Sequence, residues 1–325
     1  MKNLKIAIIG ASGLVGEKIL DILSCDKAFF GADLFLFASD KTAGKKMFHK
    51  GNEYPILRLS EKALNENFDI VFFSAGEEVS LKYAKEFAKR GAFVIDNTNA
   101  FRRIKEIPLV VPEINGNLVT ERTKIIANPN CSTIELAVAI NELKKFSNIN
   151  EIVVSTYQSV SGAGKLALND LFYETNNFFE KGIKNNIIAQ IGEILPSGYS
   201  LEEDKIMFEL NKILRDDINI CATAVRVPIA YCHGESVTVE FEKNVNLQEI
   251  KNLLNSKTTV FDDNNLFYPT EFAGKNNVAV FRLREFGDKK ITFFILADNL
   301  RRGAAYNATE IAKIILSKFF KINQK

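Results

Sequence analysis

The sequence has 325 residues, which is longer than a single domain usually is, so two domains are expected. Its hydrophobic residues make up 46% of the chain, enough for a sizeable core. Its 42 Lys and Arg residues nearly balance its 40 Asp and Glu residues, and no basic stripe indicates a nucleic-acid partner. No segment approaches the roughly eighteen consecutive apolar residues of a membrane span, and the chain starts without the apolar region of a signal peptide. The four cysteines form no CxxC pair, which argues against disulfides and a metal site and favours a cytoplasmic protein.

The first half of the chain alternates apolar strands with helices. Residues 5–9 form an apolar run of strand length, followed by a glycine turn and a helical pattern through Ile19, Leu20 and Leu23. Strand, glycine turn and helix in this order are typical of a dinucleotide-binding βαβ unit. Further strands are predicted at residues 33–38, 69–74 and 93–96. The alternation predicts a parallel sheet with helices on both faces.

The glycine turn has the spacing Gly-x-x-Gly-x-x-Gly instead of the commoner Gly-x-Gly-x-x-Gly. Gly10 permits the tight turn, Gly13 lets backbone approach a pyrophosphate, and Gly16 allows the helix to pack closely on the strand. A plain tight turn is the alternative interpretation. The cofactor-binding residues predicted here are Gly10, Ala11, Ser12, Gly13, Leu14 and Val15.

A polar loop follows the second predicted strand, where enzymes that use NAD usually carry a carboxylate for the ribose diol. Here Ser39, Lys41 and Thr42 supply hydroxyls and a positive charge, which suit the 2′-phosphate of NADP. Asp40 could instead bind the ribose diol of NAD, so NAD stays an alternative cofactor. A solvated loop without a binding role is a further alternative.

The hexapeptide Asn128 to Thr133 places Cys131 where a coil becomes a helix, because an apolar stripe at helical spacing follows it. A thiol at that junction faces unpaired backbone N–H groups and the positive end of the helix dipole, which favour thiolate over thiol. We therefore expect a nucleophile, with a buried structural cysteine as the alternative.

After this helix the pattern changes to that of a mixed sheet with helices on one face. Strands are predicted at residues 151–158, 220–227, 236–241, 278–283 and 292–297, and helices at 166–179 and 201–214. A final helix over residues 299–320 carries Ile311, Ile314, Ile315 and Phe319 on one face, and we expect it to pack on the first domain.

Polar residues gather in two places in this second half. Gln158 precedes a turn containing Ser161 and Gly162 that can expose backbone N–H groups, and His233 follows Arg226 by seven residues. A histidine in a polar loop is a good proton carrier near neutral pH. The other histidine, His49, is expected at the surface.

Taken together, these segments closely resemble the aspartate-β-semialdehyde dehydrogenase family over essentially the whole chain. The small departures are Gly234 for serine, Ser200 for threonine and Lys41 for arginine. The motifs that carry the resemblance are residues 10–13, 74–76, 96–102, 111–115, 128–133, 159–164, 198–203, 226–228 with His233, and 297–305.

The resemblance implies an α/β protein with a Rossmann-like NADP-binding domain, an α+β catalytic domain with a mixed sheet, and a last helix returning to the first domain. Residues 1–128 and 299–325 are then the dinucleotide-binding domain, and residues 129–298 the catalytic and dimerisation domain. It also implies a cytoplasmic homodimer that makes L-aspartate-4-semialdehyde from L-aspartyl-4-phosphate, with NADPH as hydride donor and phosphate released. This reaction belongs to lysine, threonine, methionine and diaminopimelate biosynthesis.

The resemblance assigns a role to each matching residue. Cys131 is the nucleophile, His233 the acid/base, and Gln158 orients the acyl intermediate. Arg226 and Glu202 hold the substrate's α-carboxylate and α-amino groups. The phosphate ligands are Arg102 and Lys205, and the residues at the nicotinamide end are Ser74, Ala75, Gly76 and Asn299. Ser161 and Gly162 are further cofactor-binding residues.

Two other functions remain open from the sequence. N-acetyl-γ-glutamyl-phosphate reductase shares the cofactor domain and the thiol chemistry, but it has no need of a carboxylate such as Glu202 for a free α-amino group. A non-catalytic NADP-binding paralogue is the second alternative, and the joint presence of Cys131, Gln158, Arg226 and His233 argues against it.

Overall fold

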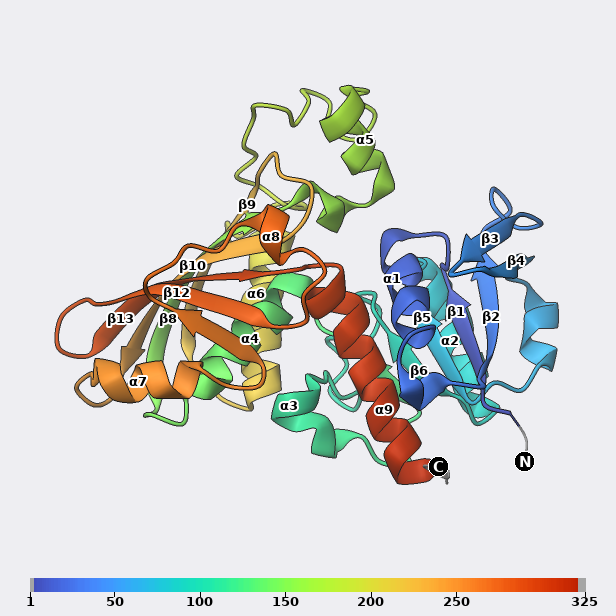
Figure 1. The fold of residues 1–325 in the computed structure, drawn as a ribbon, viewed down its shortest axis with the longest axis horizontal. Helices are drawn as coiled ribbons and strands as arrows, with labels where there is room; N and C mark the ends of the chain where they lie inside the picture. The colour runs from blue at the N-terminus through green and yellow to red at the C-terminus, as the bar shows by residue number, and fades with distance from the viewer. Residues whose placement is uncertain (1–2, 321–325) are drawn as a thin grey trace. The chain divides into compact units, whose positions relative to one another are not determined.

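The computed structural model describes residues 3–320 and separates them into two compact units (Figure 1). The first unit contains the described residues up to Pro129 and from Ala304 onward, and the second contains Asn130–Gly303. The domain boundaries predicted from the sequence lie after residues 128 and 298. Among the described residues, no helix combines the length and the apolar character needed to cross a bilayer.

The first unit is built on a seven-stranded sheet in the order β3-β4-β2-β1-β5-β6-β7. All of its strand pairs are parallel except that between β3 and β4. The strands are β1 (Lys5–Ile9), β2 (Asp33–Ala38), β3 (Lys46–His49), β4 (Asn52–Arg58), β5 (Ile70–Phe73), β6 (Phe93–Asp96) and β7 (Ile125–Ala127).

Helices cover both faces of this sheet, as the sequence predicts. Consecutive residues of a strand point to opposite faces. On one face Phe72 packs in a core with side chains of α1 (Leu14–Leu23) and α9 (Asn307–Phe319). On the other face Phe73 contacts Phe87 of α2 (Glu77–Lys89), with ring centroids 6.1 Å apart. The buried apolar runs of the strands are explained by this two-sided cover.

The last helix packs on the first unit's sheet, as expected, but it is not one regular helix from residue 299. Residues Arg301–Tyr306 form a π-helical segment, and α9 begins at Asn307. Ile311 and Ile315 of α9 are fully buried in the core that also contains β1 and β6.

The second unit has a six-stranded mixed sheet in the order β11-β12-β13-β10-β8-β9. β8 and β9 are parallel, and β10 lies antiparallel to both β8 and β13. The strands are β8 (Ile149–Gln158), β9 (Asn219–Arg226), β10 (His233–Phe241), β11 (Thr259–Asp262), β12 (Val278–Glu285) and β13 (Lys290–Ala297). The longer helices are α4 (Cys131–Leu143), α5 (Lys165–Tyr173), α6 (Leu201–Leu214) and α7 (Leu247–Leu254).

Short helical segments complete both units. They are η1 (Lys27–Phe29), η2 (Glu61–Asn65), α3 (Pro112–Asn115), η3 (Gly116–Leu118), η4 (Val160–Ala163) and α8 (Pro269–Phe272).

The helix predicted for residues 166–179 ends earlier than expected, at Tyr173. The buried carboxylate of Asp170 accepts hydrogen bonds from the backbone N–H groups of Asn177, Phe178 and Phe179. Glu174 has a φ of 53°, in the left-handed region. The carboxylate therefore offers these N–H groups a partner outside the helix, and the chain turns back around it.

Candidate active site

Cys131 is the first residue of α4, so the predicted junction between coil and helix is confirmed. Asn130 caps the helix: its side-chain oxygen accepts from the Thr133 N–H at 3.3 Å. Two carboxylates of α6 fix this cap, because the Asn130 N–H donates to Glu209 at 2.6 Å and its amide group donates to Glu202 at 2.8 Å. Cys131 is thus held at a rigid helix start.

His233 lies against the thiol, with Nε2 3.2 Å from Cys131 Sγ. The sequence placed this histidine in a polar loop, but it is the first residue of β10 and is fully buried. Ser159 offers Nδ1 a partner in either protonation state. Its backbone N–H donates to a bare Nδ1 at 3.0 Å, and its hydroxyl, 3.1 Å away, accepts from a protonated Nδ1. Nε2 can accept the thiol proton only in the second of these tautomers, in which the neutral ring carries its own proton on Nδ1.

The pKa of the Cys131 thiol is higher than expected for a cysteine that is ionised at neutral pH. Burial raises the pKa of Cys131 to about 12, and the nearby Glu202 and Glu135 carboxylates add to this, while Arg226 opposes it. The helix dipole is therefore outweighed by desolvation and by the negative charge of Glu202, to which Glu135 adds when it is ionised. Burial also lowers the pKa of His233 to about 3, aided by Arg226. At neutral pH the pair is a neutral thiol beside a neutral imidazole, and the thiol must lose its proton as it reacts.

Glu202 and Arg226 form a buried charged cluster in the same unit. The Glu202 carboxylate accepts from Gln158 Nε2 at 3.2 Å and from Lys205 Nζ at 3.2 Å. Burial alone would raise the pKa of Glu202, but Lys205, Asn130 and Gln158 outweigh it and hold the pKa below its usual value. Arg226 is also buried, and its Nη1 donates to the Ser159 carbonyl at 2.7 Å. The structure thus gathers Cys131, Gln158, Glu202, Lys205, Arg226 and His233 in one unit.

The turn after β8 supports this arrangement. A Cβ on Gly162 would lie 2.9 Å from Arg226 Nη1 and 3.3 Å from His233 Cε1, so only glycine leaves both side chains in place. The buried side chain of Asn299 bonds to the hydroxyls of Ser159 and Ser161 and to the Cys232 N–H. Asn299 and Ser161, predicted to contact the cofactor, therefore also brace the loop that holds His233.

The substitution of Gly234 for serine has a packing reason. A Cβ at this position would lie 2.8 Å from the Phe294 ring on the neighbouring strand. The departure at Ser200 is neutral, because serine caps α6: its hydroxyl accepts from the Glu203 N–H, and the Glu203 carboxylate accepts from the Ser200 N–H.

In the first unit the glycine turn has the predicted strand–turn–helix context. Gly10 has a φ of 87°, and a Cβ there would lie 2.7 Å from the Ser74 backbone. A Cβ on Gly16 would collide with the Gly10 carbonyl, which explains the close approach of α1 to β1. The segment from Gly10 to Val15 therefore lies beside the predicted segment Ser74–Gly76. Gly76 immediately precedes α2.

The loop after β2 contacts the glycine turn through a hydroxyl pair, Ser12 Oγ and Thr42 Oγ1, 3.3 Å apart. Ser39 and Lys41 in this loop are exposed. Asp40 is engaged by Arg58 at the end of β4, with Nε 2.6 Å from the carboxylate. Arg58 was not among the predicted cofactor-binding residues. It adds a positive charge to that of Lys41 and pairs with the Asp40 carboxylate, which would otherwise favour NAD.

Arg102 belongs to the first unit. It is buried, and its Nη2 donates to the Asn97 carbonyl at 2.8 Å. It also favours the ionised form of the buried Asp96, although desolvation is larger and raises the pKa of that carboxyl.

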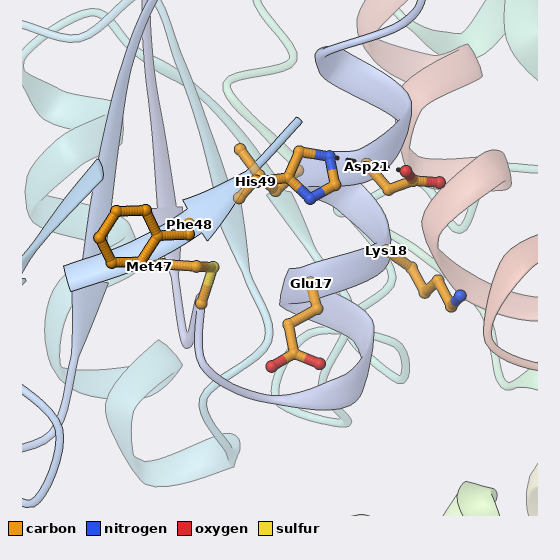
Figure 2. Close-up of a pocket in the computed structure, with 7 residues that line it drawn as sticks. Glu17, Lys18, Asp21, Met47, Phe48 and His49 are labelled. Carbon is orange, nitrogen blue, oxygen red and sulfur yellow. Dashed lines mark ion pairs between the residues drawn. The ribbon is translucent and has the colours of Figure 1, made fainter. Parts of the chain in front are cut away.

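Sequence reasoning assigned no role to Asn130, Ser159 or Glu209. The preference of helix N-caps for asparagine is the signal that could have identified Asn130. Ser159 and Glu209 had no such signal, because their partners come from distant parts of the chain. His49 is partly buried instead of fully exposed. It lines a cavity between α1 and β3, 3.6 Å from Asp21, and the cavity contains no predicted site residue (Figure 2).

Comparisons with known proteins match both units. Residues 5–122 match the family model "Semialdehyde dehydrogenase, NAD binding domain", and residues 142–302 match "Semialdehyde dehydrogenase, dimerisation domain". The chain is 38% identical to an aspartate-semialdehyde dehydrogenase of Aquifex aeolicus, over 97% of this chain and 98% of the relative. It is 39% identical to that of Bacillus subtilis, over 96% and 97%. The crystal structure of aspartate semialdehyde dehydrogenase II complexed with ASA from Vibrio cholerae superposes with a TM-score of 0.93 at 36% identity, covering 98% of this chain and all of that one.

Proposed function

Because the chain belongs to the aspartate-semialdehyde dehydrogenase family, we propose that it reduces L-aspartyl-4-phosphate to L-aspartate-4-semialdehyde, with NADPH as hydride donor and release of phosphate. This reaction supplies lysine, threonine, methionine and diaminopimelate biosynthesis in the cytoplasm. The observation that carries the proposal is the Cys131–His233 contact beside the buried Glu202 and Arg226.

Cys131 attacks the acyl carbon of the substrate, and the bond to phosphate breaks to leave a thioester. The lowered pKa of His233 keeps the ring neutral at neutral pH, and with its own proton on Nδ1, facing the Ser159 hydroxyl, it takes the thiol proton through Nε2. The imidazolium can then protonate the departing phosphate. NADPH, when bound, would supply a hydride to the thioester carbon, and the bond from that carbon to Cys131 Sγ then breaks to free the aldehyde and the cysteine. Backbone N–H groups at the start of α4 stabilise the negative oxygen formed in each half of the reaction.

Arg226 and Glu202 give the site its selectivity for an amino acid. The planar guanidinium suits the α-carboxylate, and the ionised Glu202 suits a free α-ammonium group. Lys205, 3.2 Å from Glu202, and Arg102 are the proposed phosphate ligands. Gln158, which donates to the same Glu202 carboxylate as Lys205, is the proposed orienting residue for the acyl group.

A substrate comparison tests this function against its nearest alternative. The protein should oxidise L-aspartate-4-semialdehyde in the presence of NADP and phosphate, and should leave N-acetyl-glutamate-5-semialdehyde almost untouched. The acetylated substrate lacks the charge that Glu202 would bind. Preference for the acetylated aldehyde would establish the reductase alternative, and no phosphate-dependent NADP reduction with either aldehyde would establish a non-catalytic paralogue.

The glycine turn and the loop at residues 39–42 fit a dinucleotide with a 2′-phosphate. The turn brings Gly10 beside the Ser74 backbone, and Arg58 pairs with the Asp40 carboxylate. We propose NADP as the cofactor, held by residues 10–15, 39, 41, 42 and 74–76 in the first unit, and by Ser161, Gly162 and Asn299 in the second.

Lys41→Glu should raise the apparent Kd for NADP by about tenfold or more and change that for NAD much less, because the new carboxylate repels the 2′-phosphate. Titration of both cofactors against the variant measures this. Lys62→Glu, an exposed charge reversal in the same unit, is the control. Equal losses for the two cofactors would place Lys41 away from the ribose.

We also propose a homodimer. The matched dimerisation domain supports it, and so do two large apolar side chains on the outer face of β8, Val153 and Tyr157, which are exposed.

A further inference from the structure

A second pair of ionisable side chains lies one layer below the Cys131–His233 pair. Glu135 follows Cys131 by four residues on α4, and Glu235 follows His233 by two residues on β10. Four residues of helix advance about 6 Å, and two residues of strand advance about 6.6 Å. The two carboxyl groups lie near enough for the charge of Glu235 to act on the pKa of Glu135.

This carboxyl pair is sealed from water. Glu135 and Glu235 are both 0% exposed, and none of their four carboxyl oxygens has a hydrogen-bond partner among the described residues. A Cβ on Gly303 would lie 2.8 Å from both Glu135 Oε1 and Cys131 Cβ, so one stretch of backbone touches the carboxyl and the reacting cysteine. The remaining charged and titratable groups around the pair are the buried Arg302, Asp298 and Cys232.

Two buried carboxylates without hydrogen bonds cannot both stay ionised. Burial raises the pKa of Glu235 well above its ordinary value. Burial also raises the pKa of Glu135, and Glu235 and Asp298 add to this effect, whereas Arg302 opposes it. One positive charge therefore faces three carboxyl groups.

We propose that Glu135 and Glu235 are positioning residues that hold at least one proton between them at neutral pH and thereby keep negative charge away from the Cys131 sulfur. The inference rests on the proposed role of Cys131 as nucleophile. Glu135 favours the thiol form of Cys131 when it is ionised. Ionisation of Glu135 at alkaline pH consequently opposes formation of the thiolate.

Alkylation of Cys131 by iodoacetamide, followed across pH by mass spectrometry of its peptide, tests this without any substrate. Glu135→Gln keeps the shape of the side chain but cannot ionise. At pH 7 the variant and the wild type should react within about twofold of each other. At pH 9.5 the variant should react at least about threefold faster, since a difference of half a pKa unit is threefold in thiolate.

Glu142→Gln is the matched control, because Glu142 lies farther along α4 and pairs with Lys145. It should follow the wild-type profile. Glu235→Gln should diverge from the wild type at pH 9.5 as Glu135→Gln does, and circular dichroism verifies that each variant is folded. Coincident profiles at pH 9.5 would overturn the proposal, and so would a faster Glu135→Gln variant already at pH 7. Failure of the proposed function would appear separately, as absent turnover in the wild type.

Discussion

Cys131→Ala is expected to lower turnover of aspartate semialdehyde by at least about 10³-fold while leaving NADP binding nearly unchanged. The thiol makes and breaks the covalent bond, and the proposed cofactor contacts lie mainly in the first unit. Cys131→Ser should rescue little, because a hydroxyl is far less ionised than a thiol. Steady-state kinetics and NADP titration of the same preparations separate the two effects.

Cys221→Ala serves as the matched control, since Cys221 is an exposed cysteine of the same unit and should leave turnover intact. Substantial activity in the Cys131→Ala variant would refute the assignment of the nucleophile. Loss of NADP affinity together with turnover would instead point to a structural cysteine.

Arg226→Lys is expected to reduce kcat/KM by about a hundredfold or more, equivalent to about 2.7 kcal/mol. The substrate's α-carboxylate is present in every covalent state, so the guanidinium positions the acyl group throughout the reaction. Lysine keeps the charge but loses the planar fork. It also loses the bond from Nη1 to the Ser159 carbonyl, whose residue orients His233.

Arg102→Lys should weaken phosphate more than semialdehyde, which separates the phosphate site from the carboxylate site. The exposed Arg215→Lys is the control for a change of arginine to lysine in the second unit. Both variants could instead change the apparent affinities for phosphate and for semialdehyde in the same proportion. That result would contradict the assignment of Arg102 to phosphate and of Arg226 to the α-carboxylate.

Local patterns predicted much of the fold. The apolar run of β1, the glycine turn and the stripe on α1 follow from side-chain periodicity and from the left-handed φ of Gly10, both of which act within a few residues. The start of α4 at Cys131 was predictable for the same reason, because Asn130 is a strong N-cap. β3, in contrast, is short and polar and lies at the sheet edge, and no apolar run indicates it.

The expectations that failed depend on distant residues. A helix N-terminus favours a thiolate, but desolvation and the charge of Glu202 outweigh this effect at Cys131. The burial of His233 at a strand start also depends on the packing of the whole second unit. The gathering of Gln158, Glu202 and Arg226 could be inferred only through a family resemblance, since no local spacing connects β8, α6 and β9.

Trapping the acyl-enzyme tests the central claim most directly. When the protein is mixed with L-aspartyl-4-phosphate without NADPH, it should release about one phosphate per site and carry an aspartyl thioester on Cys131, detected by mass spectrometry of the intact protein and of its peptides. Hydroxylamine should remove the adduct, and NADPH should discharge it as the semialdehyde. Turnover by an enzyme that never carries this adduct, or that carries it on another residue, would contradict the mechanism.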